Sequence, residues 1–312
     1  MVDFPVKGKP PHNVSVLERW LTEASKQTGV AAGRLRRWLG FMVVAAMLDE
    51  ARHADDGEPL FLIKGGVAME LRVDTGARAT KDLDTAFRAS MEAVADHLDP
   101  ALRAGHGDFT ATRTELEPVK DTGSVRCDIR LAYRGKSIIT VKMEVAAVEA
   151  GMGDEIDHVP AKPLDHVGLT GPETVPCIAV RWQIAQKLHA CTEVFINGEN
   201  DRFRDLLDLQ LLEELVSDDE WADVKEACLE VFVGRGKHAW PPAVTVYDSW
   251  IAGYRALAEE IGFAVVDAHE AAAAVARLIR QIERGRSPGT HPPVVPTRPP
   301  GPGSVEQSRQ LT

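Results

Sequence analysis

Two carboxylates placed two residues apart are the feature of this sequence whose residue types and spacing most clearly suggest chemistry. Asp82 and Asp84 precede Thr85-Ala86-Phe87, which continues as a predicted strand. Strand side chains repeat every second residue, so both carboxylates should face the same way, where they repel each other unless a cation lies between them. Mg²⁺ is the expected cation, because it often binds through one or two carboxylates plus substrate phosphates. Mn²⁺ could replace it.

A glycine pair precedes these carboxylates. Lys64-Gly65-Gly66 lies between an apolar run at Phe61–Ile63 and a helical-looking segment from Val67 to Arg72. Glycine has no Cβ, so its backbone can approach a phosphate closely, and the following helix would direct its N-terminal N–H groups at that anion. The pair is not a Walker A loop and by itself fits a tight turn. Together with the Asp pair it predicts a phosphate site beside a cation.

A third acid is expected on a neighbouring strand. Glu144 lies on the polar face of a predicted strand at 137–146, and Asp128, on the strand at 124–133, is the rival candidate. Metal-assisted transfer uses a further carboxylate to hold a second metal or to activate the attacking hydroxyl. The structural alternative for Glu144 is a cross-strand ion pair with an Arg or Lys.

Charged residues recur on two predicted helices late in the chain. Lys187 lies on an otherwise rather apolar helix, where a lysine either reaches solvent or holds an anion. Asp201, Asp205 and Asp208 share one helix face at i, i+4 and i+7. The alternative is that Arg202 and Arg204 form surface pairs with these acids.

The elements around these residues predict an α+β fold. It combines a mixed β-sheet lobe with flanking helices and an α-helical C-terminal lobe. The expected regions are an N-terminal arm and helix at 1–30, an α/β lobe at 31–150, a Gly/Pro-rich connector at 151–176, a helical lobe at 177–286, and a disordered Pro-rich tail at 287–312.

Composition limits the function classes. The 312 residues are 44% hydrophobic and 27% charged, with a net charge of -11, which argues against a broadly basic nucleic-acid coat. A local basic groove is still expected from Arg34, Arg36, Arg37, Arg72, Arg78, Arg202 and Arg204. No signal peptide or membrane span is visible, and the four scattered cysteines are expected to be reduced and buried. We therefore expect a soluble cytoplasmic protein.

Taken together, the KGG turn, Arg78-x-Thr80-x-Asp82-x-Asp84, Lys187 and the RFRDLLDL segment resemble the AbiEii-type nucleotidyltransferase toxins. That family includes mycobacterial MenT-type toxins of type IV toxin–antitoxin and abortive-infection systems. The resemblance covers about residues 61–215. The glycine pair with DxD is shared by the whole DNA-polymerase-β-like nucleotidyltransferase superfamily, whereas Lys187 and Asp205 narrow the resemblance to this family.

The resemblance implies roles for individual residues. The catalytic set that it implies is Asp82, Asp84, Glu144, Lys187 and Asp205. The nucleotide-binding set is Lys64, Gly65, Gly66, Arg78, Thr80 and Lys187. The metal ligands would be Asp82, Asp84 and Glu144. Asp208 shares or replaces the role of Asp205 if the spacing from the lysine differs from the family's.

The resemblance also implies a function. The chain would transfer nucleotides from ATP, CTP, GTP or UTP to an RNA acceptor, expected to be the tRNA 3′ end, and would thereby block translation and growth. A cognate antitoxin would neutralise it, by contact or by phosphorylating Thr80. The alternatives are a protein AMP-transferase or small-molecule nucleotidyltransferase on the same site, or a catalytically inactive nucleotide- or RNA-binding module. An inactive relative would be expected to lack Asp82, Asp84 or Lys187, and all three are present.

Overall fold

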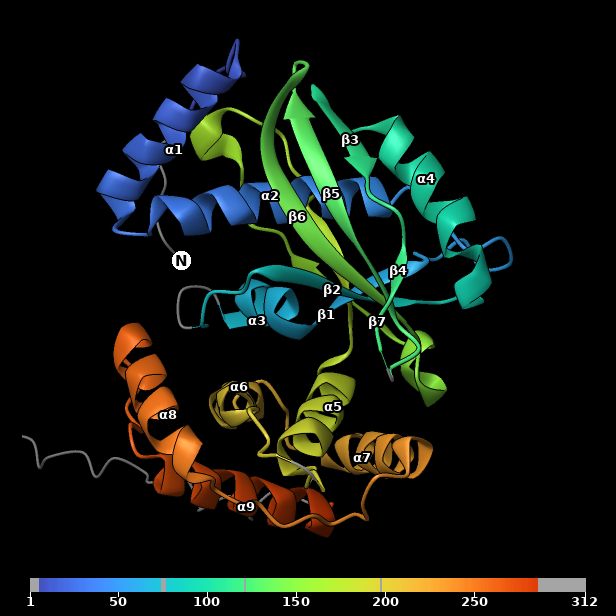
Figure 1. The fold of residues 1–312 in the computed structure, drawn as a ribbon, viewed down its shortest axis with the longest axis vertical. Coiled ribbons are helices and arrows are strands. Elements are labelled where there is room, and N and C mark those ends of the chain that lie inside the picture. The colour runs from blue at the N-terminus through green and yellow to red at the C-terminus, as the bar shows by residue number, and fades with distance from the viewer. Residues whose placement is uncertain (1–5, 74–76, 121, 197, 286–312) are drawn as a thin grey trace, which may run out of the picture.

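A computed structural model describes residues 6–73, 77–120, 122–196 and 198–285 of the chain (Figure 1). Residues 74–76 and the predicted disordered tail at 287–312 lie outside the described residues. Within the described ranges, no helix is long and apolar enough to cross a membrane. The four cysteines are free and buried, as predicted.

The sheet is mixed, as the sequence predicted. Its strands follow the order β3-β5-β6-β2-β1-β8-β7, and β4 pairs with β5 outside this path. The pairs β2–β6 and β1–β8 are parallel, and the other pairs are antiparallel. The strands are β1 Phe61–Lys64, β2 Asp82–Phe87, β3 Phe109–Arg113, β4 Glu117–Pro118, β5 Val125–Tyr133, β6 Lys136–Ala147, β7 Ile156–Pro160 and β8 Thr174–Ile178.

The segment 151–176, predicted as a connector, instead contributes strands to the sheet. It contains β7 and most of β8, and β8 places Cys177 opposite Ile63 of β1. The sequence pattern did not predict these strands because the segment contains several prolines. Proline cannot donate a hydrogen bond to a neighbouring strand. Pro160 is tolerated at the end of β7, a sheet-edge strand, and Pro176 stands opposite His158 in the β7–β8 pair. The chain therefore passes from the sheet directly into the helical lobe.

The helices form two groups on opposite sides of the sheet (Figure 1). Asn13 caps the first helix by accepting a hydrogen bond from the Val16 backbone N–H. The second ends at Leu48, and Asp49 is its C-cap residue. The helices are α1 Val14–Thr28, α2 Ala32–Leu48, α3 Gly65–Val73, α4 Val94–Ala104, α5 Val180–Thr192, α6 Phe203–Glu213, α7 Trp221–Arg235, α8 Asp248–Ile261 and α9 Ala268–Arg284. We call α5 to α9 the helical lobe.

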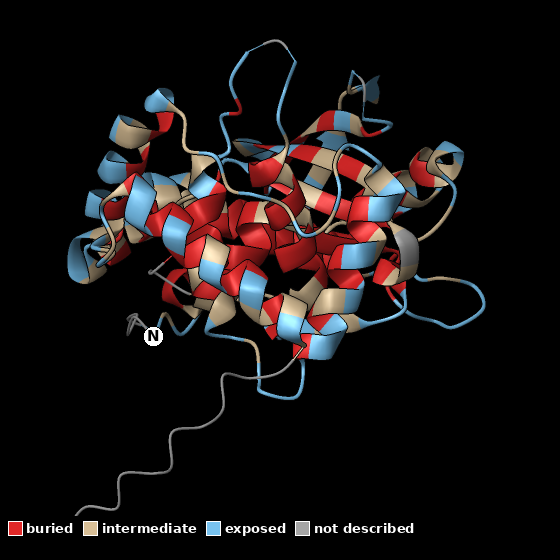
Figure 2. Ribbon diagram, turned by 90° about the horizontal axis from the view of Figure 1, so that it is seen from below, coloured by how far each residue is buried: buried red, intermediate tan, exposed pale blue. Residues whose placement is uncertain are grey.

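The alternation of β2 decides which way its carboxylates face. Leu83 and Phe87 pack into a hydrophobic cluster with residues of α2 and α4, whereas Ala86 packs into a second cluster with the helical lobe. Figure 2 shows buried residues concentrated in the middle of the molecule and exposed residues mainly on its outer helices and loops. Because strand side chains alternate, Asp82 and Asp84 lie on the Ala86 side of β2, toward the helical lobe.

Candidate active site

Asp84 lies at the centre of a row of charged residues that crosses the sheet. It stands opposite Lys64 of β1 on one side and opposite Glu144 of β6 on the other. Arg126 of β5 is opposite Glu144, but its guanidinium binds Glu117, with Nε and Nη2 at 3.3 and 3.2 Å from Oε2. Among the described residues Glu144 forms no ion pair, so the cross-strand alternative for this residue is not what the structure shows.

The rival acid Asp128 lies farther from the Asp pair. Lys142 of β6 stands between Asp82 of β2 and Asp128 of β5. Asp128 is thus separated from Asp82 by a strand, whereas Glu144 is the direct neighbour of Asp84. The register favours Glu144 as the third acid.

The glycine pair forms the turn from β1 into α3, and the helix begins at Gly65 rather than at Val67. Gly65 has a φ of +62°, in the left-handed region that favours glycine. A side chain at Gly65 would collide with the carboxylate of Asp84, and one at Gly66 would place Cβ 2.5 Å from Thr80 Oγ1. The N-terminus of α3 therefore lies against the Asp84 carboxylate with no intervening side chain.

The carboxylates around Asp84 favour the binding of a cation. Burial raises the pKa of Asp84, the nearby Glu144 and Asp82 raise it further, and Lys64 opposes this rise. The acids thus disfavour one another's charged forms, and a divalent cation would relieve this repulsion. No group of three or more acidic, histidine or cysteine side chains among the described residues is arranged to hold a metal ion by itself. The residues fit a cation that takes its remaining oxygen ligands from a nucleotide.

Lys187 is buried in a network of charges that joins α5 to α6. Its Nζ lies 2.8 Å from Asp205 Oδ1 and 2.6 Å from Asp208 Oδ2. Burial alone would lower the pKa of Lys187, but the two carboxylates outweigh it and raise that pKa, so the ammonium stays charged. Arg78 donates to Asp208 at 3.1 and 3.3 Å, and the network contains two cations and two anions. Asp208 therefore shares the position predicted for Asp205.

Two cavities meet at this network, and both are lined by Arg202 and Asp205. The first has a volume of about 220 Å³ and is lined by Lys64, Gly65, Asp84, Glu144, Gln183, Gln186, Lys187, Ala190, Arg202, Asp205 and Arg235. The second has a volume of about 670 Å³ and is lined by Arg37, Arg78, Ala79, Thr80, Lys81, Asp82, Asp201, Arg202, Arg204, Asp205, Leu257 and Glu260. The predicted site residues are thus brought together, but Arg78, Thr80 and Asp82 line a different cavity from Lys64, Asp84 and Glu144.

Two buried polar residues that sequence reasoning missed position the site. Glu70 accepts hydrogen bonds from the Trp38 indole, from Arg34 at 3.0 Å and from the Thr80 backbone N–H at 2.7 Å. Gln183 donates to the Gly65 carbonyl at 3.0 Å and accepts from Arg72. Each is a polar residue on a helix with many buried neighbours. Lys187 was noticed by this same pattern, which could also have identified Glu70 and Gln183.

The expected basic surface is only partly formed. Arg37, Arg78, Arg202 and Arg204 line the second cavity. The other arginines expected there bind acids: Arg34 binds Glu70, Arg36 binds Glu18 and Arg72 binds Asp157.

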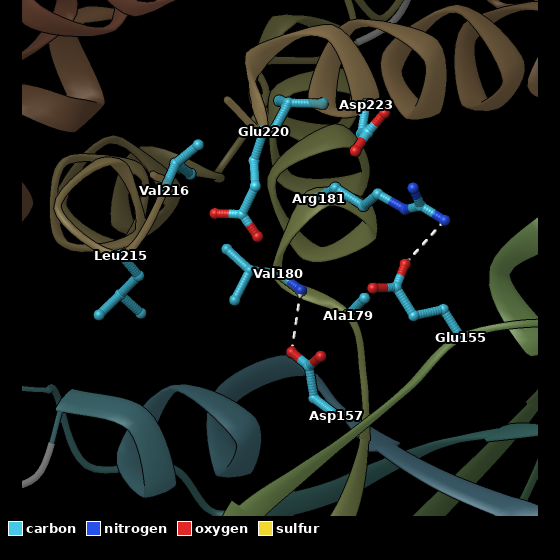
Figure 3. A pocket seen from close by; sticks show the side chains of 10 residues that line it. Glu155, Asp157, Ala179, Val180, Arg181, Leu215, Val216, Glu220 and Asp223 are labelled. Atoms are coloured by element: carbon cyan, nitrogen blue, oxygen red, sulfur yellow. Dashed lines mark hydrogen bonds and ion pairs between the residues drawn. The ribbon is translucent and has the colours of Figure 1, made fainter. Parts of the chain in front are cut away.

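A further cavity of about 70 Å³ lies on another side of α5 (Figure 3). Two of its carboxylates, Glu155 and Asp157, are bound by neighbouring groups of the protein. Glu155 binds Arg181 at 2.7 Å, and Asp157 accepts from the Val180 backbone N–H at 3.2 Å and from Arg72 at 2.6 Å. This cavity contains none of the predicted catalytic residues.

The sequence and fold are similar to those of known nucleotidyltransferase toxins. The family model for the nucleotidyl transferase AbiEii toxin of type IV toxin–antitoxin systems matches residues 47–282. MenT4, a nucleotidyltransferase toxin from Mycobacterium tuberculosis H37Rv, aligns with a TM-score of 0.51 and 17% identity over 87% of this chain and 97% of its own, which shows a shared fold. The Megavirus polyadenylate synthase aligns with a TM-score of 0.23 and 11% identity over 75% of this chain and 36% of its own, a likeness too weak to bear on the fold. No curated protein matches the chain significantly.

The class that this fold and family define is a nucleotidyltransferase. Since the family match spans well over half of the sequence, the chain belongs to the AbiEii nucleotidyltransferase toxin family of type IV toxin–antitoxin systems.

Proposed function

We propose that this enzyme transfers a nucleotide from a nucleoside triphosphate to an RNA hydroxyl, with the tRNA 3′ end as the expected acceptor. Blocking that end would stop translation and growth in the cytoplasm until a cognate antitoxin intervenes. The observation that carries the proposal is the position of Asp84. It lies between Lys64 and Glu144 in the sheet register and against the N-terminus of α3.

The triphosphate would bind in the first cavity, against Lys64 and the first residues of α3. The N–H groups at a helix N-terminus and a lysine attract phosphate oxygens, and Lys64 has no ion-pair partner among the described residues. Asp82 and Asp84 would hold Mg²⁺ together with these oxygens, and Mn²⁺ could replace it. When bound, the cation would neutralise part of the negative charge on the phosphates.

Glu144 is the group best placed to assist the acceptor hydroxyl. It is half-buried, borders Asp84 and forms no ion pair with a described residue. A carboxylate in this position can accept the proton that the hydroxyl loses as it attacks the α-phosphorus, while pyrophosphate leaves.

Lys187 would neutralise charge on the leaving phosphates from the wall of the first cavity. Asp205 and Asp208 would hold its ammonium in position. Arg78, assigned to nucleotide binding by the family resemblance, is bound to Asp208 and would act by orienting this network.

The RNA acceptor would enter through the second cavity. Arg37, Lys81, Arg202 and Arg204 line it without forming an ion pair with any described residue. The Nε group of Arg37 is buried and has no hydrogen-bond partner in the described part of the chain. With Asp205 bound to Lys187 and Asp82 bound to a cation, unpaired basic groups exceed the remaining acids there, and RNA phosphates would complement them. This surplus favours RNA over a protein or small-molecule acceptor.

Thr80 offers one route for the antitoxin. Thr80 lines the second cavity together with Asp82, and the residue is 7% exposed. A phosphate there would add negative charge next to the metal site and should inhibit. Mass spectrometry of enzyme produced with its antitoxin would show whether Thr80 is modified; an unmodified Thr80 would leave inhibition by contact as the proposed route.

The test is to incubate the enzyme with total RNA, Mg²⁺ and each α-labelled nucleotide in turn. Labelling confined to the tRNA size class is expected, with loss of labelling in EDTA and in the Asp84→Asn variant. Labelling of protein or of small molecules, with RNA unlabelled, would replace the RNA acceptor by one of the alternatives. Nucleotide binding without any transfer would support the inactive binding module.

A further inference from the structure

The first cavity extends beyond the proposed phosphate site along α5. Gln183, Gln186, Lys187 and Ala190 line it at helical spacing. Gln183 is hydrogen-bonded to Gly65 at the phosphate end, and Ala190 lies about 10 Å farther along the helix axis. A nucleotide bound by its phosphates at Gly65 would therefore extend its sugar and base toward the Ala190 end.

Arg235 forms part of that far end and is held in one orientation. Its Nε and Nη2 donate to the two oxygens of Glu149 at 2.9 and 2.7 Å. Glu149 also accepts from Gln186 Nε2 at 3.2 Å. The guanidinium at the end of α7 is thus fixed by a carboxylate beyond β6 and, through it, by α5.

This arrangement leaves donors for a ligand. A guanidinium has five N–H groups, of which Glu149 takes two. The Nη1 group lies 3.5 Å from His189 Nδ1, and one N–H on each terminal nitrogen has no partner among the described residues. His189 is buried, and burial together with the charge of Arg235 lowers its pKa to about 4, so it adds no second positive charge there. The far end therefore offers a rigid fork of hydrogen-bond donors.

We propose that Arg235, oriented by Glu149, selects the base of the incoming nucleotide and favours bases with keto oxygens over adenine. The inference rests on the proposed nucleotide site. Arginine donates and cannot accept, so it complements an edge with adjacent acceptors, such as O6 and N7 of guanine. Adenine has no keto oxygen and places an amino donor beside its N7. Arg235 is the specificity residue, and Glu149 is a positioning residue.

The test is competition between nucleotides. Full-length enzyme is given RNA with pairs of α-labelled nucleotides, each of GTP, CTP and UTP against ATP, and the ratio of kcat/KM values is measured. Wild type is expected to use at least one keto-bearing nucleotide about tenfold or more better than ATP. Arg235→Gln should reduce that ratio to near one by losing the preferred nucleotide while ATP use stays the same. Arg235→Lys, which keeps the charge without the fork, should behave like Arg235→Gln, and Glu149→Gln should give an intermediate ratio.

Arg280→Gln is the matched control, since Arg280 is exposed on α9 and lines neither cavity. An unchanged ratio in folded Arg235→Gln and Arg235→Lys, or a preference of the wild type for ATP, would overturn the inference.

If wild type labels no acceptor, calorimetric affinities of the four nucleotides replace kcat/KM. The inference then stands if Arg235→Gln binds the four nucleotides without the wild-type order of affinities. It falls if that order persists in the variant. Failure of wild type to bind any nucleotide would reject the proposed function and the inference together, whereas unchanged preference in an active variant would reject the inference alone.

Discussion

At the scale of single residues, the site depends on which side chains meet Asp84. The sequence placed Asp82 and Asp84 on one strand face, and the structure has them there. It left Glu144 and Asp128 as alternatives, because both lie on predicted strands with suitable alternation. The register favours Glu144, since Glu144 is opposite Asp84 whereas Asp128 is opposite Lys142, one strand away from Asp82.

This difference gives a matched pair of variants. Glu144→Gln should reduce nucleotide transfer by about 10²-fold or more, because the amide cannot accept the proton of the acceptor hydroxyl. Asp128→Asn should leave transfer within a few-fold of wild type. Initial rates of RNA labelling, with thermal unfolding to check folding, measure both. A loss confined to Asp128→Asn would reverse the assignment.

At the scale of elements, α5 and α6 are joined by ions as well as by apolar contacts. Lys187 of α5 binds Asp205 and Asp208 of α6, and Arg78, before β2, binds Asp208. The sequence predicted each helix and the spacing of its acids, but taken alone that spacing favoured surface pairs of Arg202 and Arg204 with these acids. Only the packing of α5 against α6 buries these groups together.

Lys187→Met should therefore cost stability as well as activity. It leaves two buried carboxylates without their ammonium partner, and we expect a loss of about 3–5 kcal/mol in the free energy of unfolding. Urea denaturation measures this loss. Adding Asp208→Asn should restore part of it, since one buried charge is then removed. A loss below about 1 kcal/mol in the single variant would show that the network is not stabilising.

The packing of α5 against α7 should give the protein an acid-sensitive stability. The pKa of His189 falls from 6.5 to about 4 on folding, so the unfolded chain binds a proton more readily. The stabilisation is present above pH 6.5 and is lost as the pH falls through 6.5 toward 4, by up to about 3 kcal/mol. Denaturant unfolding at pH 7 and pH 4.5 should show this loss, and His189→Leu should reduce it. An equal loss in that variant would assign the acid sensitivity to other groups.

At the scale of the whole molecule, an acidic protein contains a cavity in which four basic residues have no ion-pair partner among the described residues. The net charge of -11 conceals Arg37, Lys81, Arg202 and Arg204, which come from α2, the segment before β2 and the start of α6. These residues are far apart in the sequence and gather only because the helical lobe faces the sheet. Repulsion from the acidic remainder should make RNA binding depend on this cavity alone.

Removing two of its four arginines should weaken the binding of the acceptor without affecting the binding of the nucleotide. In Arg37→Gln with Arg204→Gln, the KM for RNA should rise several-fold while the KM for the nucleotide stays the same. The slope of log KM against log salt concentration should fall by about 0.7 for each RNA phosphate that the enzyme no longer neutralises. Arg19→Gln, on an exposed face of α1, is the control. Equal effects in the control would indicate a general charge effect.

The sequence by itself determined the local features: the strand that carries Asp82 and Asp84, the glycine turn before α3, most helices and the family resemblance. These follow from residue spacing within one element, which short-range sterics and hydrogen bonding fix. The tertiary structure alone decided the pairing of Glu144 with Asp84, the use of 151–176 as strands and the separation of the site into two cavities. Register and lobe packing depend on contacts between distant segments, and no local pattern encodes them. The sequence thus identified Asp82 and Asp84 as candidate site residues, whereas only the fold showed which residues lie next to them.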